Sequence, residues 1–138
     1  MVEKQLTNEM IQEGKVLLQA LDETELAPDV AIWFYFSDIH DWKLILTARK
    51  LKSSGPRDVY RLIQKTLRAL KEKVTHISLD DVALAKPDAP MIRLLSLAIG
   101  TGAGISGIRF TQNTINGVTI EDAYIYRLVH QPKARRKA

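Results

Sequence analysis

The segment from Val30 to Phe36 constrains the fold most strongly, because every one of its side chains is apolar or aromatic. A strand with one face in water alternates apolar and polar residues, whereas a strand that is apolar on both faces is covered on both sides. The β-branched and aromatic residues of this segment also favour a strand over a helix. We therefore expect residues 30–36 to form the central strand of a sheet.

Further patterns predict the remaining strands. Residues 42–49 alternate between apolar and polar side chains after a turn at 37–41, so they are expected to pair back on the first strand as a hairpin. Asn116-Gly117 is the strongest short-range hairpin signal, because these two residues suit the positive φ angles of a type I′ turn. It joins predicted strands over 108–112 and 118–128, and Val82 to Ala85 suits a short buried strand.

Apolar residues at helical spacing predict three helices, over residues 8–22, 57–73 and 91–99. Either Thr7 or Asn8 can cap the first, whose Glu9 and Glu13 are expected on the exposed side. Ser53-Ser54-Gly55 precedes the second and Pro56 suits its first position. The third is apolar nearly all round, which indicates a helix that is buried or that faces a partner.

These elements define the fold class as α/β (α+β), with the order α-β-β-α-(β)-α-β-β in a single domain. We expect a mixed or mainly antiparallel sheet of about five strands packed with three helices. A chain of 138 residues is long enough to bury one such core. Residues 1–130 are expected to form the domain, and residues 131–138 a basic, disordered tail.

Composition excludes several classes of protein. The chain has no cysteine, so disulfides, thiolate nucleophiles and cysteine-based metal sites are excluded. Its longest apolar runs fall far short of the roughly 20 residues that span a bilayer, and its first residues lack the pattern of a signal peptide. We expect a soluble, cytoplasmic protein that does not contact a membrane.

Charge is sorted along the chain. Residues 1–42 hold nine acidic side chains against Lys4 and Lys15, and residues 43–73 hold ten basic side chains against Asp58 and Glu72. The net charge of +4 equals the four cations within residues 133–137, so the rest of the chain sums to zero. A neutral body with one positive face indicates an acidic protein partner as well as it indicates nucleic acid.

The candidate binding residues are four cations on one side of the second predicted helix: Arg57, Arg61, Lys65 and Arg68. At helical spacing they lie opposite the apolar face of that helix, so the stripe is exposed while the helix packs. Its like-charged i,i+4 pairs cost on the order of 0.2–0.5 kcal/mol each, a cost that an anionic surface would offset. Four interpretations remain open: a solvated face, pairing with the acidic first helix of the same or another copy, an acidic protein, and nucleic acid.

The segment Gly102 to Gly107 matches the text pattern of a dinucleotide-binding loop. That site needs a strand before the loop and a helix after it, because the pyrophosphate lies at the N-terminus of that helix. Here a helix is predicted before the segment and a strand after it. We therefore expect a flexible connection over residues 100–107 and no cofactor, with a mobile lid as the alternative.

Pro28-Asp29 and Asp41-Trp42-Lys43 imitate the pattern of metal-dependent nucleases, in which two carboxylates share a Mg²⁺ ion beside a lysine. Asp29 precedes one strand of the predicted hairpin and Asp41 the other, so the two are expected at opposite ends. Asp38, His40 and Asp41 do share one turn. A metal-dependent phosphodiesterase or nuclease centred on residues 38–43 is therefore the enzyme alternative, although no metal site is predicted.

The sequence favours a non-enzymatic binding module that uses the basic helix face toward an acidic protein or nucleic acid. No acid, base and nucleophile converge in it, and its three histidines lie in separate segments. A homodimer is also predicted, in which the acidic first helix meets the basic second helix of another copy around residues 91–99. In the alternative, the first two helices cover one face of the sheet within the monomer, and residues 91–99 cover the other.

Overall fold

The computed structural model describes residues 4–47 and 55–129, and their element order confirms the predicted order. The elements are α1 (Asn8–Leu21), β1 (Val30–Phe36), β2 (Asp41–Thr47), α2 (Pro56–Ala69), the short 3₁₀ turn η2 (Leu79–Asp81), β3 (Val82–Ala85), α3 (Pro90–Ser96), β4 (Ile108–Ile115) and β5 (Val118–Leu128). The predicted tail over 131–138 and the predicted cap residues Ser53 and Ser54 lie outside the described residues. No described helix has both the length and the apolar character needed to cross a membrane.

The five strands form one mixed sheet in the order β3-β2-β1-β5-β4. Neighbouring strands are antiparallel except β2 and β3, which are parallel because α2 carries the chain across between them. β1 lies at the centre, and five of its seven residues are buried. The prediction of a central strand over residues 30–36 is therefore confirmed.

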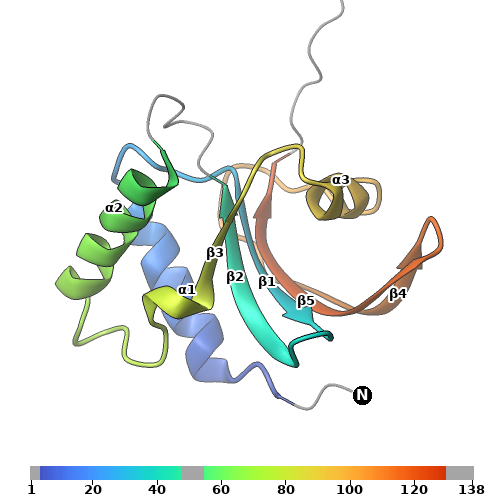
Figure 1. Cartoon of the computed structure of the whole chain (residues 1–138), viewed down its shortest axis with the longest axis horizontal. Coiled ribbons are helices and arrows are strands. Elements are labelled where there is room, and N and C mark those ends of the chain that lie inside the picture. Colours follow the sequence, from blue (N-terminus) through green and yellow to red (C-terminus); the bar gives the residue numbers. More distant parts are fainter. Residues whose placement is uncertain (1–3, 48–54, 130–138) are drawn as a thin grey trace, which may run out of the picture.

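Helices cover both faces of this sheet (Figure 1). α1 and α2 lie together on one face, whereas α3 lies alone on the other. Trp33 and Leu44 face the α1 and α2 side, while Ile32 and Ile45 belong to the core under α3. This is the monomer arrangement that the sequence left open for the three helices.

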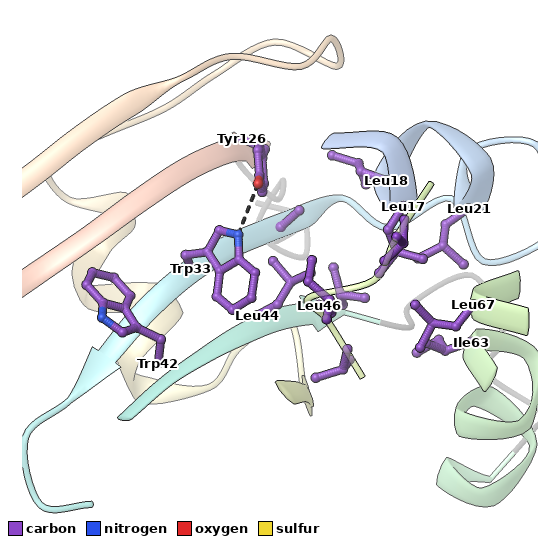
Figure 2. Close-up of a cluster of buried hydrophobic side chains, with 14 of the residues drawn as sticks. Leu17, Leu18, Leu21, Trp33, Trp42, Leu44, Leu46, Ile63, Leu67 and Tyr126 are labelled. Carbon is purple, nitrogen blue, oxygen red and sulfur yellow. Dashed lines mark hydrogen bonds between the residues drawn. The ribbon is translucent and has the colours of Figure 1, made fainter. Parts of the chain in front are cut away.

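The closest approach between a helix and the sheet occurs at Gly14 of α1. An added Cβ there would collide with the Tyr126 hydroxyl and would lie 2.9 Å from Trp33 Nε1. The hydroxyl fills this space because it accepts a hydrogen bond from Trp33 Nε1 at 3.0 Å and donates one to the Ile11 carbonyl at 2.6 Å. Figure 2 shows Trp33 and Tyr126 meeting within the surrounding leucine side chains. Glycine at position 14 therefore sets how closely α1 packs on the sheet.

A β-bulge places Tyr126 in this position. Ala31 pairs with Arg127 and the next residue, Ile32, pairs with Ile125, so Tyr126 is the extra residue on β5. Its carbonyl accepts a hydrogen bond from Ser106 N at 2.6 Å. On the other side of the bulge, the buried Arg127 donates two hydrogen bonds to Asp22, each of 2.8 Å. The bulge thereby connects β5 to both ends of α1.

The structure corrects several details of the sequence-based expectations. α2 ends at Ala69 and α3 at Ser96, several residues earlier than their apolar periodicity predicts, because turns take over there. Strand β4 continues to Ile115, and φ angles of 51° and 81° at Asn116 and Gly117 confirm the type I′ turn after it. β3 is an edge strand in which only Val82 is buried.

We expect Gly14→Ala to lower the free energy of unfolding by roughly 1–3 kcal/mol, because the new Cβ would force Tyr126 or α1 to move. In an ordinary helix interior the same change stabilises by up to about 1 kcal/mol. Urea denaturation measures the difference. Gly104→Ala is the matched control, because a Cβ there would meet nothing within 4 Å.

The same measurement in a Tyr126→Phe background tests the cause. Removal of the hydroxyl takes away the atom that the new Cβ would hit, so Gly14→Ala should cost less there than in the native chain. An equal cost in both backgrounds would contradict the proposed contact.

Candidate functional site

The four predicted binding residues lie together on the outer side of α2. Val59, Ile63 and Leu67 bury the inner side of the helix in the core that α2 shares with α1. Arg57, Arg61, Lys65 and Arg68 are all exposed, as their helical spacing predicts. α2 is also the outermost element on its side of the molecule (Figure 1). Below, the "basic face" of α2 means these four residues.

Most of the positive charge on the basic face is uncompensated. Arg61 lies 3.6 Å from Asp58, and both side chains are well exposed, so this contact contributes little. Among residues 4–47 and 55–129, Arg57, Lys65 and Arg68 take part in no ion pair. Among the described residues, the acidic first helix of the same chain therefore forms no ion pair with the stripe.

Local sequence explains how α2 begins and ends. Gly55 occupies the N-cap without a side-chain hydrogen bond, and Pro56 follows at the start of the helix, where its missing N–H costs nothing. Asp58 in the first turn and Arg68 in the last turn both have the favourable sign for the helix dipole. These two charges favour the helix, whereas three of its cations take part in no ion pair among the described residues.

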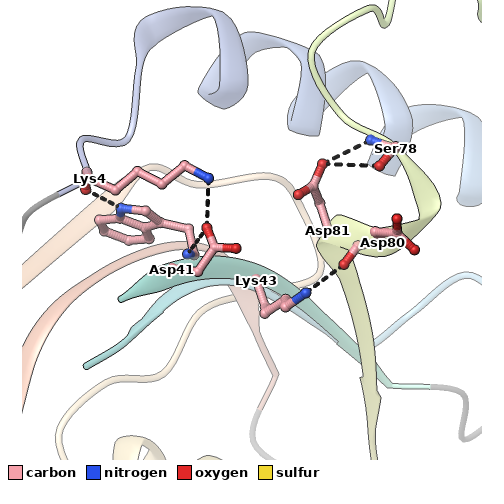
Figure 3. A network of polar contacts seen from close by, with 7 residues as sticks. Lys4, Asp41, Lys43, Ser78, Asp80 and Asp81 are labelled. Carbon is pink, nitrogen blue, oxygen red and sulfur yellow. Dashed lines mark hydrogen bonds and ion pairs between the residues drawn. The ribbon is translucent and has the colours of Figure 1, made fainter. Parts of the chain in front are cut away.

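In the turn over residues 38–43, Asp41 and Lys43 make contacts with other parts of the chain (Figure 3). Asp41 accepts hydrogen bonds from Lys4 Nζ at 2.7 Å and from Trp42 N at 2.8 Å. The hydrogen bond from Lys4 is the main reason that the pKa of Asp41 is lowered. Lys43 Nζ donates to the Asp80 carbonyl at 2.6 Å. Both members of the nuclease-like pair in this turn are therefore already engaged by other parts of the chain.

The described residues hold no metal-ligand cluster around this turn. Within 4–47 and 55–129, no three His, Asp or Glu side chains converge closely enough to hold an ion. The β1–β2 register pairs Phe36 with Asp41 and Ala31 with Leu46. Because Asp29 precedes β1, it lies at the far end of the hairpin from Asp41, as predicted.

The glycine-rich segment at 100–107 lies between α3 and β4, so the predicted helix-before and strand-after context is confirmed. The connection, which the sequence predicts to be flexible, is hydrogen-bonded to the end of β5. Thr101 N donates to the Leu128 carbonyl at 3.0 Å, and Arg127 Nε donates to the Gly104 carbonyl at 3.2 Å. A lid that opens over these residues would have to break such contacts.

A buried carboxylate was missed by the sequence analysis. Glu13 is only 8% exposed, although it was expected on the exposed side of α1. Its carboxylate accepts a hydrogen bond from His76 N at 2.6 Å and contacts His76 Nδ1 at 2.7 Å and Thr75 Oγ1 at 3.3 Å. The available signal was its spacing, because Glu13 lies one helical turn before the buried Leu17.

This contact shifts both pKa values. Burial alone would raise the pKa of Glu13, but the hydrogen bonds from His76 and Thr75 outweigh it, and the pKa lies below its ordinary value. The hydrogen bond to Glu13 raises the pKa of His76. The pair therefore joins α1 to the segment that follows α2, and it does so best when both groups are charged.

The predicted homodimer gains no support from the described residues. It required the acidic and basic helices to surround residues 91–99 in one interface. In the structure α3 lies on the opposite face of the sheet from α1 and α2, so these parts do not form one surface (Figure 1). Self-association stays a prediction.

Comparison with known proteins adds no relative. No family model, no curated protein and no solved structure matches the chain. The candidate site is therefore inferred from the geometry of this molecule alone.

The Glu13–His76 pair should make stability depend on pH in two directions. The Glu13 pKa is lowered, so its contribution is present above about pH 4.3 and is lost as the pH falls through the folded-state value. The His76 pKa is raised, so its contribution is full below about pH 6.5 and is lost as the pH rises through the folded-state value. The pair should therefore stabilise most between about pH 4.3 and 6.5.

Urea denaturation of Glu13→Gln from acid to mildly alkaline pH tests this expectation. The free energy of unfolding of the native chain should fall below about pH 4.3 and above about pH 6.5. Glu13→Gln removes the charged pair, so the variant should lose this decrease in stability. Glu23→Gln, an exposed change of the same kind, should keep it. A Glu13→Gln profile parallel to the native one would rule out the pair as its source.

Proposed function

We propose that this protein is a non-enzymatic binding module that engages a polyanionic partner, an acidic protein or nucleic acid, through the basic face of α2. The observation that carries the proposal is the exposed row of Arg57, Arg61, Lys65 and Arg68, in which only Arg61 has an ion-pair partner among the described residues. Like charges at i,i+4 destabilise a helix that has nothing to offset them. A polyanion supplies that compensation.

The packing of α2 supports the same role. The buried residues Val59, Ile63 and Leu67 fix the rotation of the helix, so the four cations point away from the core as a set. The Tyr60 hydroxyl accepts a hydrogen bond from Leu84 N at 3.1 Å and ties α2 to β3. A helix that is held in place before binding loses less conformational entropy when the partner arrives.

The enzyme alternative, a metal-dependent nuclease centred on residues 38–43, gains no support from the described residues. Asp41 and Lys43 are engaged by Lys4 and by the Asp80 carbonyl, and no three His, Asp or Glu side chains of the described residues converge to hold an ion. We therefore favour binding over catalysis.

Retention on a heparin column tests the proposal, because heparin presents dense negative charge without a protein surface. Reversing two charges on the basic face, with Arg61→Glu and Lys65→Glu, should make the full chain elute at clearly lower salt than the native chain. Lys86→Glu with Arg93→Glu is the matched control, because it changes the net charge equally at exposed positions before and within α3. Equal shifts for the two double variants would contradict a role for α2.

A further inference from the structure

We propose that the polyanion is double-stranded nucleic acid, held through its phosphate backbone and without reading of its base sequence, an inference that rests on the proposed function above. The surface of α2 has the charges that phosphate contacts need. It lacks the apolar groups that a protein partner needs and the aromatic groups that a single strand needs.

A protein partner would require an apolar centre. Protein interfaces bury aromatic and aliphatic side chains at their centre, and charged groups at the rim add specificity more than affinity. The exposed large hydrophobic residues of the described chain are Ile39, Leu97 and Val118, and none of them belongs to α2. An acidic protein would therefore meet charges on α2 without an apolar anchor among them.

A single strand would require stacking platforms. Proteins that bind single strands without sequence preference place successive bases on aromatic side chains. Tyr60 is the only aromatic residue of α2, and it is partly buried with its hydroxyl on Leu84 N of β3. One half-buried aromatic side chain cannot supply platforms for successive bases, which leaves the duplex backbone as the nucleic-acid form that needs nothing beyond cations.

The spacing of the basic face suits a row of phosphates. Arg57, Arg61 and Lys65 follow one another at four-residue intervals, which is about 6 Å along the helix axis, and the row from Arg57 to Arg68 extends over roughly 16 Å. Duplex DNA carries one negative charge per about 1.7 Å of its axis. A single row of this length can therefore meet several phosphates at once.

Contacts of this kind position a protein on a duplex but carry no sequence information. Apart from the four cations, the exposed residues of α2 are Pro56, Asp58 and Ala69, and neither Pro56 nor Ala69 carries a side-chain hydrogen-bonding group that could read a base edge. We therefore expect affinity that is independent of sequence and strongly dependent on salt.

Fluorescence anisotropy of the full chain with labelled 20-base-pair duplexes of unrelated sequence, at several salt concentrations, tests the inference. If all four cations contact phosphates, log Kd should depend on log salt with a slope of magnitude about 3.6 from the basic face alone. Arg61→Ala with Lys65→Ala should weaken binding by roughly tenfold or more at low salt and reduce that slope by about two. Lys86→Ala with Arg93→Ala is the charge-matched control and should leave the slope unchanged.

The competing partners are measured in the same assay, with a labelled single strand of equal length and with labelled polyglutamate. Tighter binding to the single strand or to polyglutamate than to the duplex, with loss of that binding in the Arg61→Ala/Lys65→Ala variant, would overturn the duplex inference and leave the proposed function standing. Binding to none of the three probes, or equal losses in the two double variants, would overturn both. Circular dichroism melting curves verify that each variant folds.

Discussion

The packing of α1 against the sheet depends on the narrow gap between the helix backbone at Gly14 and the side-chain hydroxyl of Tyr126. Glycine at position 14 lets the helix backbone approach until the Tyr126 hydroxyl bridges the Ile11 carbonyl and Trp33 Nε1. If the helix moved outward, the Tyr126 hydroxyl would lose its acceptor, the Ile11 carbonyl, and an unpaired buried polar group costs about 1–3 kcal/mol. The bridge therefore fixes both the height and the position of α1 over the central strand.

The position of α1 in turn determines where α2 packs on the sheet. The two helices share one core on the same face of the sheet, in which Leu17 and Leu21 of α1 and Ile63 of α2 are fully buried (Figure 2). Glu13 and His76 then join α1 to the segment that follows α2. With its apolar side fixed in this way, α2 has only one side left for its cations, and that side faces outward.

Local patterns in the sequence predicted most of the fold. The apolar segment at 30–36, the Asn116-Gly117 turn and the periodicity of α2 each depend on interactions within a few residues. The strand, the turn and the buried side of α2 were predicted correctly, although the helix ends at Ala69 and not at residue 73. The contacts that were missed join distant parts of the chain. Glu13 meets His76 and Asp22 meets Arg127 across intervals of 63 and 105 residues, and no local pattern encodes such pairs. The basic face could be located from the sequence because helical spacing alone brings its four residues together.

Amide and arginine side-chain NMR spectra of the isotope-labelled full chain, recorded while an unlabelled DNA duplex is added at low salt, test the account most directly. The account predicts that the resonances that shift most belong to residues 56–69, including the Nε–H groups of Arg57, Arg61 and Arg68, while those of α3 and of the turn at 38–43 stay in place. The largest shifts at α3, at that turn or along the β4 edge, or no shifts at all, would contradict it.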